Sequence, residues 1–266
     1  MKERPKGTAE IIEVEGDREI IVVIPTADFN GKYAKECRES IFKGIHIIFV
    51  ESGFPKDPYF NYAHNCNVGI KKAIEYNPKW IVISNDDMFK IDSPDILTRS
   101  LDEINDEVYD VVFVSSSRYH SKKSSYAKMN LFFYLLLKLT NFHEGRRLLK
   151  YYRKFSIEFM SFSFPIVSVF FHKRGYTLME LLDFGIISNK FAKMKDGNVF
   201  DETFVNGRED VDLSIEFSLT KERIAFINYR IGDYIGSSLG NGKQRLIRDV
   251  ANLAYLNYKR KIVTKN

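Results

Sequence analysis

The sequence predicts an α/β fold with a mainly parallel sheet flanked by helices. Between residues 20 and 115, short apolar runs rich in Ile and Val alternate four times with segments of helical pattern. Continuous apolar runs are typical of strands buried on both faces, and their alternation with helices is typical of βαβ units. Each run also ends in polar or acidic residues, and ligands bind beyond the carboxyl ends of strands in such sheets.

Local signals in the chain predict the individual elements. A proline closes the first apolar run, and Ser93 followed by Pro94 has the pattern of a helix N-cap and first turn. The predicted elements in order are strand 20–25, helix 32–43, strand 45–50, helix 61–76, strand 80–84, helix 93–105, strand 110–115, strand 223–229 and a C-terminal helix.

Length, composition and charge favour one large domain in the cytoplasm. The 266 residues are 44% hydrophobic and 28% charged, with a modest net charge of +5, and a chain of this size buries a substantial core without a second domain. Cys37 and Cys66 show neither metal-type spacing nor a disulfide pattern, which favours a reduced, intracellular protein. We find no signal-peptide core and no membrane-spanning apolar run, and we expect no nucleic-acid partner.

A segment of different character follows residue 116. A loop rich in Ser and Lys leads to the apolar run MNLFFYLLLKL and the basic stretch GRRLLKYYRK, which together predict a helical insertion over residues 124–154. Its Leu and Phe side chains would rest in a membrane interface while Arg and Lys side chains meet lipid phosphates, giving peripheral membrane contact. Packing of the same apolar stripe on the core or in a homodimer is the other reading, and it is favoured because buried apolar stripes are common.

Two adjacent acidic residues, Asp86 and Asp87, follow directly on the third strand, after Asn85. Neighbouring carboxylates repel each other unless a cation or hydrogen bonds compensate. Carboxylate oxygens suit Mg²⁺ or Mn²⁺, which proteins usually hold through one or two such ligands together with substrate phosphates. An exposed Asx turn explains the same tripeptide, so the pattern alone leaves both readings open.

Polar residues also close the other two strands and open the second helix. Because the carboxyl ends of parallel strands converge, the strand-end residues predict a binding cleft. At the helix start, amide side chains and unpaired backbone N–H groups would meet a nucleotide, although ordinary helix capping explains them equally. The candidates are Pro25, Thr26, Asp28, Glu51, Asn67 and Gly69.

A third acidic group, Glu209, Asp210 and Asp212, lies at the predicted start of a later helix. The helix dipole favours acidic residues there, so a structural role needs no active site. A carboxylate held near an electrophilic sugar would alternatively serve as the general base for an incoming hydroxyl.

Taken in order, the motifs IIVVIPT, NCNVGIKKAI, WIVISNDD, FDETF and REDVDL resemble glycosyltransferase family 2, especially its rhamnosyltransferase-like members, over residues 20–219. The resemblance implies a GT-A fold and an inverting transfer of a sugar from a nucleotide-sugar donor to a glycan or lipid-linked acceptor. It also implies a Mn²⁺ or Mg²⁺ cofactor. On this basis the domain divides into a nucleotide-binding half, an acceptor half and a C-terminal extension, at residues 19–115, 116–219 and 220–266.

The resemblance implies roles for particular acids. Asp87 matches the metal ligand, with Asp86 beside it at the donor diphosphate. Asp210 matches the general base, and Glu209 takes that role in a shifted register. Asp233, in the segment IGDYIGSS, stands where the family often carries a histidine, and it implies an oxygen ligand to the metal.

Departures from the family pattern keep other functions open. Asn85 replaces the first acid of the strand-end motif, and Glu51 stands where an aspartate is more usual. A degenerate glycan- or nucleotide-binding module without turnover is therefore one alternative. A nucleotidyltransferase, which also combines an α/β sheet with a carboxylate-held metal, is another.

Overall fold

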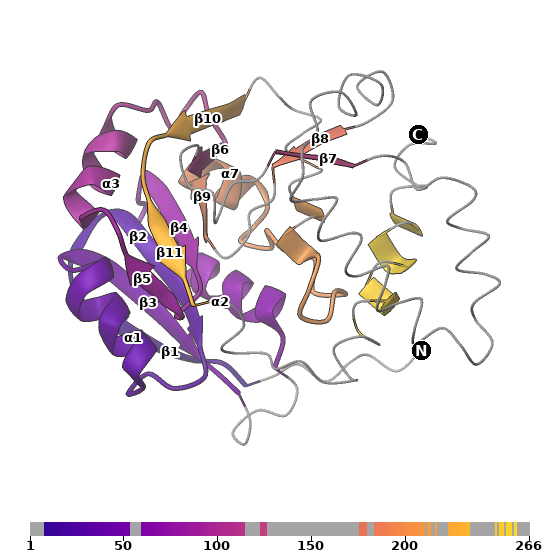
Figure 1. Cartoon of the computed structure of the whole chain (residues 1–266), viewed down its shortest axis with the longest axis horizontal. Helices are drawn as coiled ribbons and strands as arrows, with labels where there is room; N and C mark the ends of the chain where they lie inside the picture. Colours follow the sequence, from indigo (N-terminus) through magenta and orange to yellow (C-terminus); the bar gives the residue numbers. More distant parts are fainter. Residues whose placement is uncertain are drawn as a thin grey trace. The chain divides into compact units, whose positions relative to one another are not determined.

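A computed structural model describes residues 8–53, 60–114, 123–126, 176–179, 184–210, 212, 213, 216, 223–234, 248, 250–252, 254–256, 258 and 259, with backbone alone for 123–126, 176–179 and 233. The chain divides into two units, one formed by residues 1–121 with 181–266 and the other by residues 122–180. The first unit carries the main sheet, and the second contains strands β7 and β8 (Figure 1).

The first unit holds most of the described helices and strands. Its elements are β1 Glu10–Val14, β2 Asp17–Thr26, α1 Lys32–Glu36, the π-helical turn η1 Cys37–Ile41, β3 Ile45–Glu51, α2 Tyr62–Ile74, β4 Trp80–Ser84, β5 Met88–Lys90, α3 Pro94–Asp102, β6 Val111–Val114, β9 Phe184–Ser188, α7 Asn189–Met194, β10 Ile224–Ile227 and β11 Ile231–Asp233. Helical residues also occur at 209–216 (the acidic helix) and at 248–259 (the C-terminal helix), as far as these ranges are described.

The main sheet has seven strands in the order β1-β3-β2-β4-β9-β6-β10. Strand β2 is parallel to β3 and β4, and β6 is parallel to β10. Strand β1 is antiparallel to β3, and β9 is antiparallel to both β4 and β6. The predicted α/β sheet flanked by helices is confirmed, but the sheet is mixed, because β1 at one edge and β9 between β4 and β6 run opposite to their neighbours.

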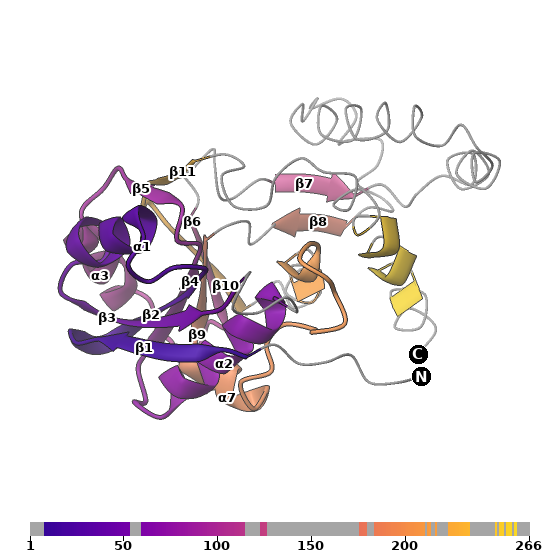
Figure 2. The ribbon, with the colours of Figure 1, turned by 90° about the horizontal axis from the view of Figure 1, so that it is seen from below.

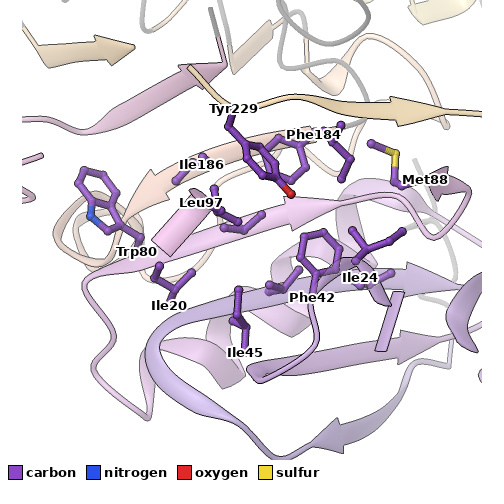
Figure 3. Close-up of a cluster of buried hydrophobic side chains, with 14 of the residues drawn as sticks. Ile20, Ile24, Phe42, Ile45, Trp80, Met88, Leu97, Phe184, Ile186 and Tyr229 are labelled. Atoms are coloured by element: carbon purple, nitrogen blue, oxygen red, sulfur yellow. The ribbon is translucent and has the colours of Figure 1, made fainter. Parts of the chain in front are cut away.

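Both faces of the sheet are buried under helices. In Figure 2, α1 and α3 lie on one face, and α2 and α7 lie on the other. On the first face Ile20, Val22 and Ile24 of β2 pack with side chains of α1, η1 and α3, and part of this cluster is drawn in Figure 3. Burial on both faces explains the apolar runs of β2, β3 and β4, because every residue of β3 and β4, and of β2 from Ile20 onward, is buried.

The opposite face holds α2 very close to the sheet. A Cβ atom added to Gly69 would lie 2.3 Å from Cγ1 of Val23 and 3.0 Å from Cγ2 of Val50. Only glycine therefore fits this position without a shift of the helix or of Val23. Asn61 precedes α2 as its N-cap, and its side chain accepts a hydrogen bond from the N–H of His64 at 3.3 Å.

Two predicted helices differ from their observed forms. Instead of one helix over 32–43, a short α-helix passes into the π-helical turn η1. The helix predicted from residue 93 ends earlier than expected, at Asp102, with Ser93 as N-cap and proline in the first turn. Helix ends are set by packing as well as by local sequence, so such boundary differences are common.

The predicted helical insertion begins in a strand. Within the second unit, Ser124 to Tyr126 belong to β7, Lys123–Tyr126, which pairs antiparallel with β8, Tyr176–Met179. Residues 127–154, the rest of the predicted insertion, lie outside the described residues. No helix in the described part of the chain is both long and apolar enough to cross a membrane.

The close approach of α2 predicts a large effect of Gly69→Ala. The added methyl group must displace the helix or Val23, so we expect the free energy of unfolding to fall by about 1–3 kcal/mol, although alanine has the higher helix propensity. Lys71→Ala, an exposed change on the same helix, is the matched control. Urea unfolding followed by circular dichroism measures both, and an unchanged midpoint for Gly69→Ala would contradict the packing.

Candidate functional site

The carboxyl ends of β2, β3 and β4 are joined by hydrogen bonds, and we call Thr26, Glu51, Ser52, Asp86 and Asp87 the strand-end cluster. The hydroxyl of Thr26 donates to Oδ2 of Asp86 at 2.7 Å, and the N–H of Ser52 donates to the carbonyl of Thr26 at 2.9 Å. Parallel pairing of β2 with both neighbours places these ends at one edge of the sheet. The predicted convergence of strand-end residues is therefore observed for this set.

The two adjacent acids are largely buried. Burial raises the pKa of Asp86, and the neighbouring charge of Asp87 raises it further, whereas the Thr26 hydroxyl lowers it. Asp87 is 6% exposed. A cation near this pair would offset both the desolvation and the mutual repulsion of the two carboxylates.

A two-stranded ribbon brings the two predicted metal ligands to neighbouring backbone positions. Strand β11 pairs antiparallel with β5, with Asp233 opposite Met88, and the N–H of Tyr234 donates to the carbonyl of Asp87 at 2.9 Å. Figure 1 shows β11 alongside β5. The chain thus returns to the end of β4 and sets Asp233 beside Asp87 along the backbone.

The other end of the ribbon is fixed by an ion pair. The Arg230 guanidinium donates to Oδ1 of Asp92 at 2.8 Å, and the Arg230 backbone N–H donates to Oδ2 at 2.8 Å. These bonds from Arg230 hold the pKa of Asp92 below its ordinary value. Between the two ends, a Cβ atom on Gly232 would lie 2.1 Å from the ring of Phe89. The bonds of Arg230 and the close contact at Gly232 therefore fix the register that places Asp233 opposite Met88.

Three of the predicted strand-end residues, Asp28, Glu51 and Pro25, have local roles. Asp28 is exposed and accepts the N–H of Asn30 at 2.9 Å, which is an Asx turn. Glu51 is 8% exposed, and its Oε1 accepts the N–H of Phe29 at 3.4 Å. Pro25 is buried beyond the last residue that β2 pairs with β4, where its missing N–H costs no bond to β4.

Asn67 and Gly69 are used in packing rather than presented at the strand ends. The Asn67 amide exchanges hydrogen bonds with the backbone of Phe200 at 2.8 and 2.9 Å and donates to Oε1 of Glu202 at 3.1 Å. Asn67 is 1% exposed, and Gly69 is pressed against the sheet. The structure does not bring either residue into the strand-end cluster, and it gives both a structural function.

The two candidate bases differ in their surroundings. Glu209 is 5% exposed, and one of its oxygens accepts the N–H of Gly207 at 2.6 Å. Burial raises the pKa of Glu209, and the backbone hydrogen bonds oppose that rise. Asp210 is half-buried and is therefore the more exposed of the two candidates. Arg208, just before them, has a φ of 74°, which makes a tight turn into the acidic helix.

Helix α2 connects the strand-end cluster with the acidic residues. Near its start, the Asn65 amide donates to the Ser52 hydroxyl at 2.6 Å. The N–H of Tyr62 donates to Oδ1 of Asn206 at 2.8 Å. Burial raises the pKa of the Cys66 thiol, and the nearby Glu209 carboxylate adds to that rise. One helix is therefore hydrogen-bonded both to the end of β3 and to the turn before the acidic helix.

The same helix binds Glu202, which motif spacing did not single out. Nδ1 of His64 lies 3.0 Å from Oε2 of Glu202, and the Asn61 amide donates to the Glu202 carbonyl at 3.0 Å. The residues are about 140 positions apart in the chain, so no spacing in the sequence marks the contact. The only signal in the sequence is the residue types. The segment FDETF carries two acids, and the polar residues at the start of α2 need hydrogen-bond acceptors.

The C-terminal helix supplies further residues that sequence analysis missed. Lys259 donates to Oδ2 of Asp201 at 2.7 Å and to Oδ2 of Asp212 at 2.6 Å, and the Tyr255 hydroxyl donates to Asp201 at 2.9 Å. Although burial favours the neutral acid, the hydrogen bonds from Lys259, the Thr203 N–H and Tyr255 hold the pKa of Asp201 at about 2.

The residues at the strand ends have carboxylate oxygens of the kind that a divalent cation takes as ligands. Among the described residues, no three His, Cys, Asp or Glu side chains gather as a complete metal-binding group. Mg²⁺ and Mn²⁺ commonly take one or two carboxylates and complete their coordination with phosphates and water. The donor set at Asp87, with Asp233 beside it along the backbone, has the oxygen chemistry for that arrangement.

The lowered pKa of Asp201 predicts a pH-dependent contribution to stability. Because the folded pKa lies below the ordinary value of 3.8, the contribution is complete above about pH 4 and is lost as the pH falls toward 2. Asp201→Asn should therefore lower the free energy of unfolding by about 1–2 kcal/mol at pH 6 and by progressively less below pH 4.

Urea unfolding between pH 3 and pH 6 measures this difference. The exposed Asp196→Asn serves as the control and should change stability by less than about 0.5 kcal/mol. A constant effect of Asp201→Asn across the whole range would contradict the ionic contact with Lys259.

Comparison of the chain with protein-family models, with curated proteins and with solved structures gave no match. The assignment of a function therefore rests on the residues and their arrangement. Three features carry it: the buried acids at the end of β4, the ribbon that returns Asp233 beside them, and the acidic helix that α2 links to the strand ends.

Proposed function

We propose that this protein is a metal-assisted, inverting glycosyltransferase of the GT-A type. It would transfer a sugar from a nucleotide-sugar donor to a hydroxyl of a glycan or lipid-linked acceptor. The observation that carries the proposal is the pairing of β11 with β5, which sets Asp233 opposite Met88 and next to Asp87. Two acids far apart in the sequence thus occupy neighbouring backbone positions at the end of a buried central strand, and α/β sheets bind their ligands beyond such strand ends.

The strand-end cluster would hold the diphosphate of the donor. Asp87, with Asp233, would hold Mn²⁺ or Mg²⁺, which supplies positive charge for the departing nucleoside diphosphate. Asp86 is oriented by the Thr26 hydroxyl at 2.7 Å, so the carboxylate pair keeps a fixed geometry before ligand arrives. Such preorganisation reduces the reorganisation that the reaction would otherwise require.

Asp210 is the better candidate for the general base. The acceptor oxygen would attack the anomeric carbon while the bond from that carbon to the diphosphate oxygen breaks, and the hydroxyl proton would pass to Asp210. A single displacement of this kind inverts the anomeric configuration. Glu209 is less suited because it is 5% exposed, whereas Asp210 is half-buried. Its function would be to shape the turn that presents Asp210.

Release of nucleoside diphosphate from a panel of nucleotide sugars tests the proposal. With Mn²⁺ or Mg²⁺, we expect release from one donor and its loss in EDTA. Asp87→Asn and Asp210→Asn should each lower kcat/KM by about 10²–10⁴-fold, since they remove the metal ligand and the proton acceptor. Asp95→Asn, an exposed aspartate on α3, is the matched control and should leave the rate unchanged.

Two outcomes would point to other functions. Metal-dependent release of pyrophosphate from a nucleoside triphosphate, without reaction of any nucleotide sugar, would identify a nucleotidyltransferase. Binding of nucleotide or glycan without turnover, with glycan and lipid-linked acceptors present, would identify a binding module. In either case Asp210→Asn would have no glycosyl transfer to abolish, and the proposed function would be wrong.

A further inference from the structure

Lys259 makes the central contact between the C-terminal helix and the acidic residues. Its Nζ lies 2.7 Å from Oδ2 of Asp201 and 2.6 Å from Oδ2 of Asp212. Asp201 lies before the turn into the acidic helix, and Asp212 lies within that helix, two residues after Asp210. One ammonium group thus ties together the two sides of the chain segment that carries the proposed base.

The charges in this contact depend on one another. The Asp201 and Asp212 side chains are 20% and 18% exposed, and that of Lys259 is 34% exposed. Burial raises the pKa of Asp212, and Lys259 opposes that rise, while the Asp201 charge adds to it. Burial lowers the pKa of Lys259, but the hydrogen bonds to both aspartates raise it above its ordinary value. Without the ammonium group, two half-buried carboxylates would repel each other across the turn.

Two further contacts fasten the same segment to the same helix. The Asn252 amide exchanges hydrogen bonds with the backbone N–H and carbonyl of Val205, both at 3.0 Å, and Asn252 is 3% exposed. The ring of Tyr255 packs edge to face on Phe204, with centroids 4.9 Å apart. These contacts hold residues 204 and 205 independently of charge, so removal of the Lys259 ammonium group should loosen the turn without releasing the whole segment.

We propose that Lys259 is a positioning residue for Asp210, holding the base-bearing turn through Asp201 and Asp212. This inference rests on the proposed function, because it assigns a purpose to a contact outside the reacting groups. Lys259 itself touches neither metal nor substrate in this account. Its effect on the reaction passes through the placement of the Asp210 carboxylate, and displacement of a catalytic group by about 1 Å can cost about 10²-fold in rate.

Lys259→Met and Lys259→Arg, compared with the wild-type chain, test the inference. Methionine keeps much of the apolar stem and removes the charge, whereas arginine keeps the charge and can reach both carboxylates. Lys190→Met removes a more exposed lysine that is paired with Glu107 and is the matched control. For each protein, kcat, the KM for the donor, the dependence of kcat on pH and hydrogen exchange of residues 201–212 would be measured.

Lys259→Met should lower kcat by about 10- to 100-fold, leave the donor KM within about twofold and speed hydrogen exchange in residues 201–212. Lys259→Arg should recover most of kcat, and Lys190→Met should match the wild type in every readout. A wild-type kcat in Lys259→Met would overturn the inference. So would a loss of kcat that arginine does not restore and that only follows the unfolded fraction.

Failure of the inference can be told apart from failure of the proposed function. If the wild type transfers sugar and Lys259→Met does so equally well, the inference alone is wrong. If the wild type transfers no sugar from any donor, the proposed function is wrong and the catalytic purpose of Lys259 falls with it. Hydrogen exchange then still decides whether Lys259 orders residues 201–212, since that readout needs no substrate.

Discussion

The close packing of α2 on the sheet is the constraint on which the arrangement of the site depends. Gly69 lets the helix approach Val23 and Val50 to a distance that no side chain would permit. From that position the first turns of α2 bind Ser52 at the end of β3 and Asn206 before the acidic helix. A helix held farther from the sheet could not make both contacts. The strand-end cluster and the acidic helix would then no longer be held by the same helix.

Polar contacts around α2 also explain why so many amides are buried in this region. Asn61, Asn65 and Asn67 are each buried and each donate to a partner outside the helix. A buried amide without partners would cost free energy, whereas a paired one fixes a unique arrangement of the chain segments that it joins. The cost of burying polar groups is thus offset by the accuracy with which the strand ends and the segment 200–206 are placed.

The sequence predicted the elements that depend on local pattern and missed those that depend on distant partners. The runs that form β2, β3 and β4 were identified within a few residues, because strands buried on both faces leave an uninterrupted apolar signal. Neither the direction of β9 nor the three-residue strands β5 and β11 leave such a signal. Likewise, acids at strand ends were recognisable, but Asn67 was expected at a ligand and instead binds Phe200, and no spacing revealed Lys259.

A crystal structure with Mn²⁺ and a nucleoside diphosphate, in which the anomalous scattering of manganese locates the metal, would decide whether the end of β4 is a metal site. We expect one manganese ion that contacts the Asp87 carboxylate and a diphosphate oxygen, with Asp233 in its coordination sphere and with Asp210 facing the same ligand. Manganese bound away from the end of β4, or a nucleotide bound there equally well without metal, would contradict this expectation.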